Sequence, residues 1–197
     1  MGKNRQRKSV ILAFEASTDY LSAALLVDDA VLGMKKIESA FGQAAKLMPL
    51  AVEVLVAAKI KFSELTHVVA GCGPGSFTGL RVALATAKGV CISLDLPGLG
   101  ISGMEALAFS SAQSRHGLPI LSVADTRRGK VYAQLFDSDV TPYGKIFETQ
   151  IEKLPFLVPT HIRSNGLAIT GYKCAEVEQV FVAAGIEVKS KYLLMED

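Results

Sequence analysis

An internal repeat is the feature that most restricts the fold of this 197-residue chain. The segment ILSVADTRRGKVYAQLF at 120–136 resembles ILAFEASTDYLSAALLV at 11–27, and at an offset of 110 residues Asp125 falls on Glu15 and Val131 on Leu21. In both segments an apolar strand ends at an acidic residue, a polar turn follows, and a second strand runs back. We therefore predict an α/β protein built from two related halves.

The apolar and turn patterns predict the elements of each half. In the first half we expect an antiparallel meander of three strands, then a helix, a strand, a helix and a short strand, at 10–16, 21–27, 27–38, 42–60, 66–73, 78–93 and 97–101. The second half opens with a helix at 104–113 and has strand and helix signals at 166–173 and 174–185. We divide the chain into a flexible basic tail at 1–8, an N-terminal half at 9–103 and a C-terminal half at 104–197.

Charge and composition exclude some classes of function. Four of the 21 basic residues lie in the first eight positions, so the remaining chain is slightly acidic. Nucleic-acid binding normally requires a basic face, and none is expected outside the tail. The three cysteines lack metal-site spacing, and no apolar run reaches the roughly 20 residues of a membrane span. We expect a cytoplasmic protein.

The stretch GCGPGSFTGLR at 71–81 admits two interpretations. It lacks the lysine of a P-loop and the third glycine of a dinucleotide fingerprint. Its glycines still suit a helix N-terminus that contacts a phosphate, and on that interpretation the contacting residues are Glu15, Gly73, Gly75, Ser76 and Asp125. Alternatively, the stretch is only a tight strand-to-helix connection, and each acid accepts backbone N–H bonds in its turn.

The sequence contains no constellation for catalysis. His67, His116 and His161 have no second ligand at helical spacing, and the chain has no nucleophile-elbow motif. We therefore predict no catalytic residue and no metal ligand.

The two long helices of the first half carry few charges. The first has only Lys46 and Glu53 between Ala44 and Ala58, and the second has only Arg81 and Lys88 between Thr78 and Ser93. A surface helix usually keeps a broader polar face, so we expect these helices to pack against something besides their own sheet. We favour a partner protein; the alternative is the second half of the chain. The interface residues we predict are Leu47, Leu50, Val54, Leu55, Ala58, Gly79, Ala83 and Ala87.

Three segments carry a resemblance to a known family. ILAFEASTDYLSAALL, GCGPGSFTGLRVALATAKGV and VADTRRGKVYAQLF, in this order and spacing, resemble the bacterial TsaB (YeaZ) family, over most of residues 9–175. The resemblance implies the ASKHA fold of actin, sugar kinases and Hsp70. It also implies a noncatalytic scaffold or activator in the synthesis of threonylcarbamoyladenosine on tRNA.

The resemblance also implies partners. TsaB binds the related transferase TsaD through its N-terminal helices, works with the ATPase TsaE, and pairs with itself through the same surface when alone. It implies that ATP and magnesium serve the complex and that this chain binds no cofactor alone, meets tRNA only through the complex and has no membrane contact.

Some positions depart from the family. Glu15 stands where the family usually has aspartate, and Gly42 and Gln43 stand where it usually has a histidine. The chain also ends at KYLLMED, short of the usual C-terminal segment, so the second half is expected to be incomplete. The alternative function, an independent nucleotide-dependent enzyme of the ASKHA class, would use Glu15, Asp125 and the loop from Gly73 to Thr78.

Overall fold

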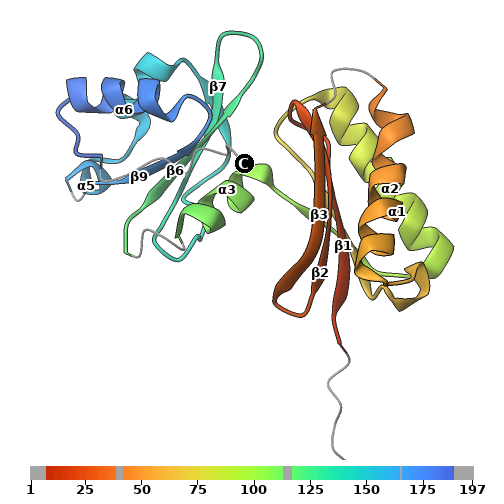
Figure 1. The fold of residues 1–197 in the computed structure, drawn as a ribbon. Coiled ribbons are helices and arrows are strands. Elements are labelled where there is room, and N and C mark those ends of the chain that lie inside the picture. Colours follow the sequence, from red (N-terminus) through yellow and green to blue (C-terminus); the bar gives the residue numbers. More distant parts are fainter. Residues whose placement is uncertain (1–7, 39–41, 113–116, 165, 189–197) are drawn as a thin grey trace, which may run out of the picture. The chain divides into compact units, whose positions relative to one another are not determined.

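The computed structural model describes residues 8–38, 42–112, 117–164 and 166–188, and it divides into two compact units at Ile101 and Ser102. Each unit is an α/β layer structure, as Figure 1 shows. The expectations for residues 1–7, His116 and the KYLLMED end lie outside the described residues.

The first unit is a five-stranded sheet in the order β3-β2-β1-β4-β5. Strands β1 (Val10–Glu15), β2 (Tyr20–Val27) and β3 (Ala30–Glu38) form the predicted antiparallel meander. Strands β4 (His67–Gly71) and β5 (Gly98–Ile101) extend the sheet in parallel. A parallel extension needs a crossover connection, and the helices α1 and α2 supply the two crossovers.

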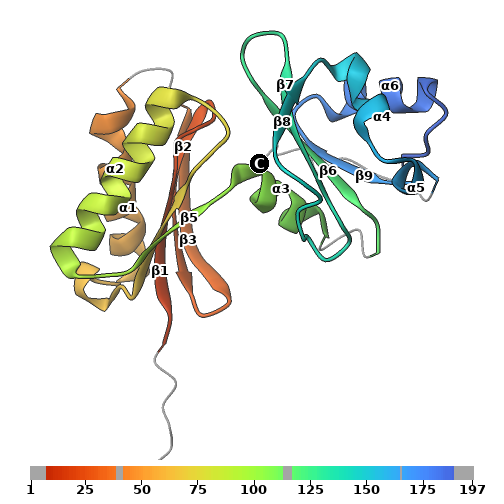
Figure 2. The same ribbon diagram turned by 180° about the vertical axis from the view of Figure 1, so that it is seen from behind.

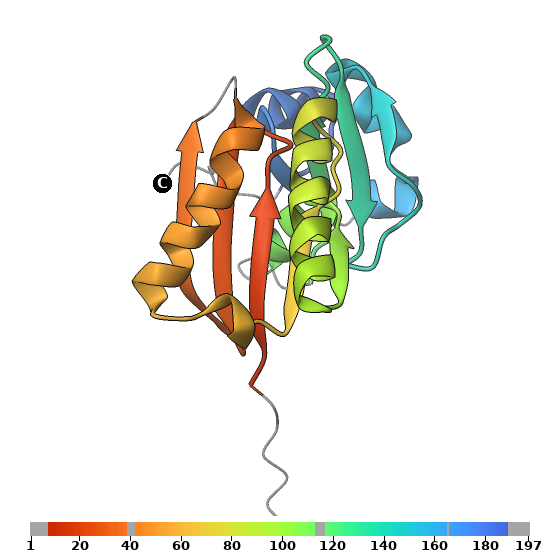
Figure 3. The same ribbon diagram turned by 90° about the vertical axis from the view of Figure 1, so that its right-hand side faces the viewer.

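Helices α1 (Gln43–Ala58) and α2 (Phe77–Leu94) cover one face of this sheet. Figure 3 shows them side by side across the strands, α1 in orange and α2 in yellow-green. Leu12 and Phe14 of β1 and Leu25 of β2 point into the core beneath the helices, because strand side chains alternate between faces. The meander and both helices are confirmed, with ends within three residues of the prediction.

The second unit is a four-stranded sheet in the order β8-β7-β6-β9. Its strands are β6 (Ile120–Asp125), β7 (Val131–Phe136), β8 (Phe147–Thr149) and β9 (Ala168–Gly171). Helix α3 (Gly103–Ala112) packs on one face through Met104 and Ala108. The short helices α4 (Leu154–Leu157) and α5 (Thr160–Arg163) and the longer α6 (Cys174–Ala183) pack on the other, as Figure 2 shows.

Helix α2 is unusually apolar. Within the described residues it is the one helix whose 18 residues are long and apolar enough to cross a membrane by length and composition alone. However, Gly79, Ala83, Ala87 and Val90 form a buried row against the sheet, which is the packing of a helix on its own domain.

Candidate functional site

The glycine stretch forms a corner between β4 and α2 that packs on the turn of the first hairpin. The Ser76 N–H donates to the Ser17 carbonyl oxygen at 2.8 Å. A Cβ on Gly75 would stand 2.4 Å from that same oxygen, and one on Gly79 would stand 1.7 Å from the Ala16 oxygen. Real Cβ atoms do not approach this closely, so only glycine lets the backbones of corner and turn meet.

The corner also caps its helix. The Ser76 side-chain oxygen accepts the N–H of Gly79 at 3.3 Å, and its carbonyl oxygen accepts that of Leu80 at 2.9 Å. Gly73 has a φ of +90°, a conformation that favours glycine. These contacts account for Gly73, Gly75, Ser76 and Gly79 without a ligand, which favours the tight-connection interpretation.

The two acids bind their own turns. Glu15 Oε1 accepts the backbone N–H of Ser17 at 2.5 Å, and Asp125 Oδ1 accepts that of Arg127 at 2.8 Å. In both cases the donor lies two residues beyond the acid, a local bond that stabilises a turn. The Glu15 carboxylate also lies over Gly71, where a Cβ would stand 1.9 Å from Oε2.

The repeat in the sequence matched Asp125 with Glu15, but the strand registers show that the two acids are not at equivalent positions. Glu15 pairs with Ser22 on the sheet face away from α1 and α2, whereas Asp125 pairs with Val131, a core residue beneath the helices of its own unit. An offset of 109 residues matches the buried faces of the first strands, and it places Asp125 on Ala16. A one-residue slip reverses every side chain of a strand, so the acids occupy different faces.

Asp125 borders a polar hollow of about 330 Å³ in the second unit. Its charged lining is mixed in sign and comprises Asp125, Arg127, Lys130, Glu152, Lys173 and Glu176. Lys130 is bound to Glu148 at 2.7 Å and Lys173 to Glu176 at 2.8 Å. The hydrogen bond and charge of Glu176 raise the pKa of Lys173. Lys130 and Lys173 are thus each paired with a carboxylate of the chain.

No group of three or more potential metal ligands occurs within the described ranges. The imidazole of His67 lies 2.9 Å from the Thr66 hydroxyl, and that of His161 packs on Tyr143 with ring centroids 5.8 Å apart. Burial raises the pKa of the Cys174 thiol to about 11, so it stays protonated and poorly nucleophilic at neutral pH.

The residues predicted to contact a partner are instead part of the unit's own core. Leu47, Leu50, Val54, Leu55, Ala83 and Ala87 are buried beneath the helices, Gly79 is buried against the first hairpin, and Ala58 packs partly against the same core. This prediction of interface residues is corrected on a physical ground: in each helix the chosen row is the one that covers the sheet.

The outward face of the same two helices is nevertheless apolar. Its residues, which we call the α1–α2 outer face, are Ala45, Met48, Val52, Val56, Ala85, Gly89 and Ile92. Val56 and Ile92 are 70% and 72% exposed. Lys46, Glu53, Arg81 and Lys88, the four charges singled out in the sequence, are exposed as well. Two helices with so much uncovered apolar surface are typical of an interaction site.

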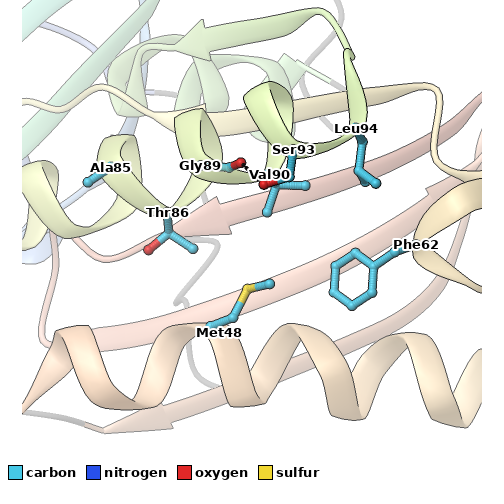
Figure 4. A pocket seen from close by; sticks show the side chains of 8 residues that line it. All are labelled: Met48, Phe62, Ala85, Thr86, Gly89, Val90, Ser93 and Leu94. Carbon is cyan, nitrogen blue, oxygen red and sulfur yellow. Dashed lines mark hydrogen bonds between the residues drawn. The ribbon is translucent and has the colours of Figure 1, made fainter.

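A groove of about 420 Å³ lies between the two helices. Figure 4 shows Met48 of α1 facing Ala85, Thr86 and Gly89 of α2, with Phe62 closing one end. A Cβ on Gly89 would meet nothing within 4 Å, so this glycine leaves space that a side chain from another molecule can fill.

The comparisons with known proteins return TsaD for the family model and TsaB or YeaZ for the individual relatives. A sequence model described as "TsaD: tRNA N6-adenosine threonylcarbamoyltransferase" matches residues 41–187. The TsaB protein of Bacillus subtilis is 34% identical over 127 residues, which cover 64% of this chain and 54% of that protein. The TsaB protein of Buchnera aphidicola is 30% identical over 123 residues, covering 62% and 58%. The chain belongs to the TsaB (YeaZ) family.

The structures support the same fold. YeaZ from Pseudomonas aeruginosa superimposes with a TM-score of 0.74 at 24% identity, over 87% of this chain and 79% of that one. The predicted fold class is confirmed as an α/β protein of two halves, each with a mixed sheet and flanking helices. The matched region spans little more than half the length of the curated TsaB relatives.

Sequence reasoning missed the exposed residues of the TsaB-family helices, although a signal for two of them was present. Ala85 and Ile92 follow Arg81 and Lys88 by four residues. Residues four apart on a helix share a face, so an exposed charge marks its i+4 neighbour as outward.

Proposed function

We propose that this chain is a noncatalytic scaffold or activator subunit in tRNA threonylcarbamoyladenosine biosynthesis and that it binds the transferase TsaD through the α1–α2 outer face. The observation that carries the proposal is the uncovered apolar surface of these helices in a member of the TsaB family. The relatives' names, "tRNA threonylcarbamoyladenosine biosynthesis protein TsaB", supply the process.

The geometry of the helices suits a helical partner. Ala45, Ala85 and Gly89 are small enough to let a facing helix approach closely, while Met48, Val52 and Ile92 provide larger apolar contacts. The same surface on a second copy would support a homodimer when TsaD is absent. TsaE and tRNA would then contact this chain only within the complex.

We further propose that the chain holds no cofactor of its own and that ATP and magnesium act elsewhere in the complex. The bonds of Glu15 and Asp125 to their own turns support this proposal, because they commit an oxygen of each acid to backbone N–H groups. Calorimetric titration of the isolated chain with ATP and magnesium should give no binding heat; a saturable heat would favour the nucleotide-dependent enzyme.

The matched experiment is Val56→Arg against Val31→Arg. Both valines are largely exposed, at 70% and 64%, but Val56 lies on the α1–α2 outer face and Val31 lies on β3. We expect Val56→Arg to abolish co-elution with TsaD in size-exclusion chromatography and Val31→Arg to leave it unchanged. Equal co-elution of both variants would exclude the α1–α2 outer face.

The activator role has its own test. Threonylcarbamoyladenosine formation, reconstituted with TsaD and TsaE, should fall at least about tenfold when this chain is left out. It should fall similarly with Val56→Arg, because binding is lost. Full activity without this chain would refute the activator role.

A further inference from the structure

A second apolar groove lies on the opposite side of α2 from α1. It has a volume of about 290 Å³ and is lined by Val68 and Ala70 of β4, Leu84, Ala87, Lys88 and Cys91 of α2, and Gly98, Leu99 and Gly100 of β5. We call it the α2–β5 groove. It shares no lining residue with the groove between α1 and α2, so its occupant is a separate question from TsaD binding.

Strand β5 forms the outer wall of this groove and ends the sheet. In the described part of the chain it pairs with β4 alone. The carbonyl oxygens of Pro97 and Ile101 accept the N–H groups of Val68 in β4 and of Cys72 directly after it, at 3.1 and 2.9 Å. Because alternate residues of a strand direct their polar groups to opposite sides, Gly98 and Gly100 direct theirs away from β4.

The two glycines leave this edge unusually open. All four residues of β5 are exposed, and Leu99 is 64% exposed. An exposed edge strand is a template for pairing with another chain unless proline, charge or a covering element protects it. The sequence of β5, GLGI, contains no such protection.

The charge around the α2–β5 groove indicates which kind of segment can bind there. Lys88 lines the α2–β5 groove, no acid lines it, and neither α2 nor β5 contains an acidic residue. Two copies of this chain meeting at β5 would bring like charges together, which is unfavourable. A segment that carries carboxylates would be complementary.

We propose that the β5 edge and the α2–β5 groove bind an extended segment of a partner protein. This segment adds a sixth strand to the sheet by pairing with Gly98 and Gly100, and it places a carboxylate side chain at Lys88. Backbone pairing of this kind supplies affinity, and the alternate side chains supply specificity.

The test uses the full chain and two probes, the capped hexapeptides Glu-Val-Glu-Val-Glu-Val and Lys-Val-Lys-Val-Lys-Val, followed by amide chemical shifts. We expect the acidic peptide to bind at least about tenfold more tightly, with the largest shifts at Gly98 and Gly100. Lys88→Glu should reverse the preference. No binding, no preference, or shifts confined to α1 would overturn the proposal.

A matched pair of variants tests the backbone pairing. Gly100→Pro removes the outward N–H, which no bond to β4 uses, and an edge strand tolerates proline. Gly100→Ala retains that N–H, and its Cβ would meet Cys72 at an ordinary 3.5 Å. The proline variant should lose at least about tenfold in affinity and the alanine variant should not. Equal affinities, or a wild-type dimer that only Gly100→Pro dissociates, would refute binding of a partner segment.

Discussion

The carbonyl oxygen of Ala16 lies against Gly79, 1.7 Å from the position that a Cβ on this glycine would occupy. Gly79 lies in the first turn of α2, and Ala16 follows the last residue of β1. The start of this helix is thus fixed against the turn of a hairpin more than sixty positions earlier in the chain. Four predictions follow from this and the other contacts.

Gly79→Ala should destabilise the protein, although alanine favours helices. The methyl group must displace backbone rather than a flexible side chain, and overpacking of this kind costs about 1–3 kcal/mol or more. Gly89→Ala is the control on the same helix: its Cβ meets nothing within 4 Å, so it should stabilise by up to about 1 kcal/mol. Urea denaturation measures both. If Gly79→Ala left the free energy of unfolding unchanged, this would contradict the packing of the glycine corner on the turn of the first hairpin.

Ala83→Glu and Ala85→Glu should differ sharply. Ala83 is fully buried against the sheet, so a glutamate there would leave a carboxylate in the core and cost roughly 3–5 kcal/mol. Ala85 lies on the α1–α2 outer face, and its substitution should change stability by about 0.5 kcal/mol or less. Thermal unfolding followed by circular dichroism distinguishes them. If Ala83→Glu folds as well as wild type, the inward face has been assigned wrongly.

Asp125 should act as a hydrogen-bond acceptor in its turn. Asp125→Ala removes the acceptor of the Arg127 N–H and should cost about 1 kcal/mol, whereas Asp125→Asn keeps an oxygen at that place and should cost less. The free energy of unfolding gives the comparison. Equal losses in both variants would show that the negative charge, rather than the acceptor, is required.

Cys174 should make the protein less stable at alkaline pH. Burial raises the pKa of its thiol from 9.0 to about 11, so the folded state keeps a proton that the unfolded state releases. The folded state binds more protons in this window, and stability therefore falls as the pH rises from about 9 to about 11. Cys174→Ala should show a smaller loss of unfolding free energy between these pH values, although its own stability at pH 7 is lower. An identical pH dependence would contradict a buried thiol.

The local sequence patterns predicted the fold well, because apolar residues recur at a characteristic spacing in strands and at a different one in helices. The alternation of buried Leu12 and Phe14 with half-buried neighbours, and the glycines at the corner, required no knowledge of distant contacts. The faces of the two long helices could not be assigned in the same way. Both faces are apolar, so hydrophobicity did not distinguish Val54, which covers the sheet, from Val56, which faces outward.

The two acids show a second limit of sequence reasoning. Glu15 and Asp125 were correctly recognised as ends of strands, and the bond to a turn N–H was one of the two interpretations kept open. The aligned repeat nonetheless treated them as equivalent positions, because an ungapped comparison does not reveal that the two turns differ in length by one residue. Pairing with Ser22 and Val131 settles the register, and that pairing depends on backbone geometry.

The hydrogen bond from Ser76 to Ser17 also has a consequence for the order of folding. It joins two residues separated by the whole of β2, β3, α1 and β4, so closing this loop costs more chain entropy than closing any hairpin of the sheet. The hairpin of β1 and β2 can form from local contacts, but the corner requires the parallel pairing of β1 with β4. The most family-specific stretch of the sequence is thus expected to reach its native contacts late, after the meander that it rests upon.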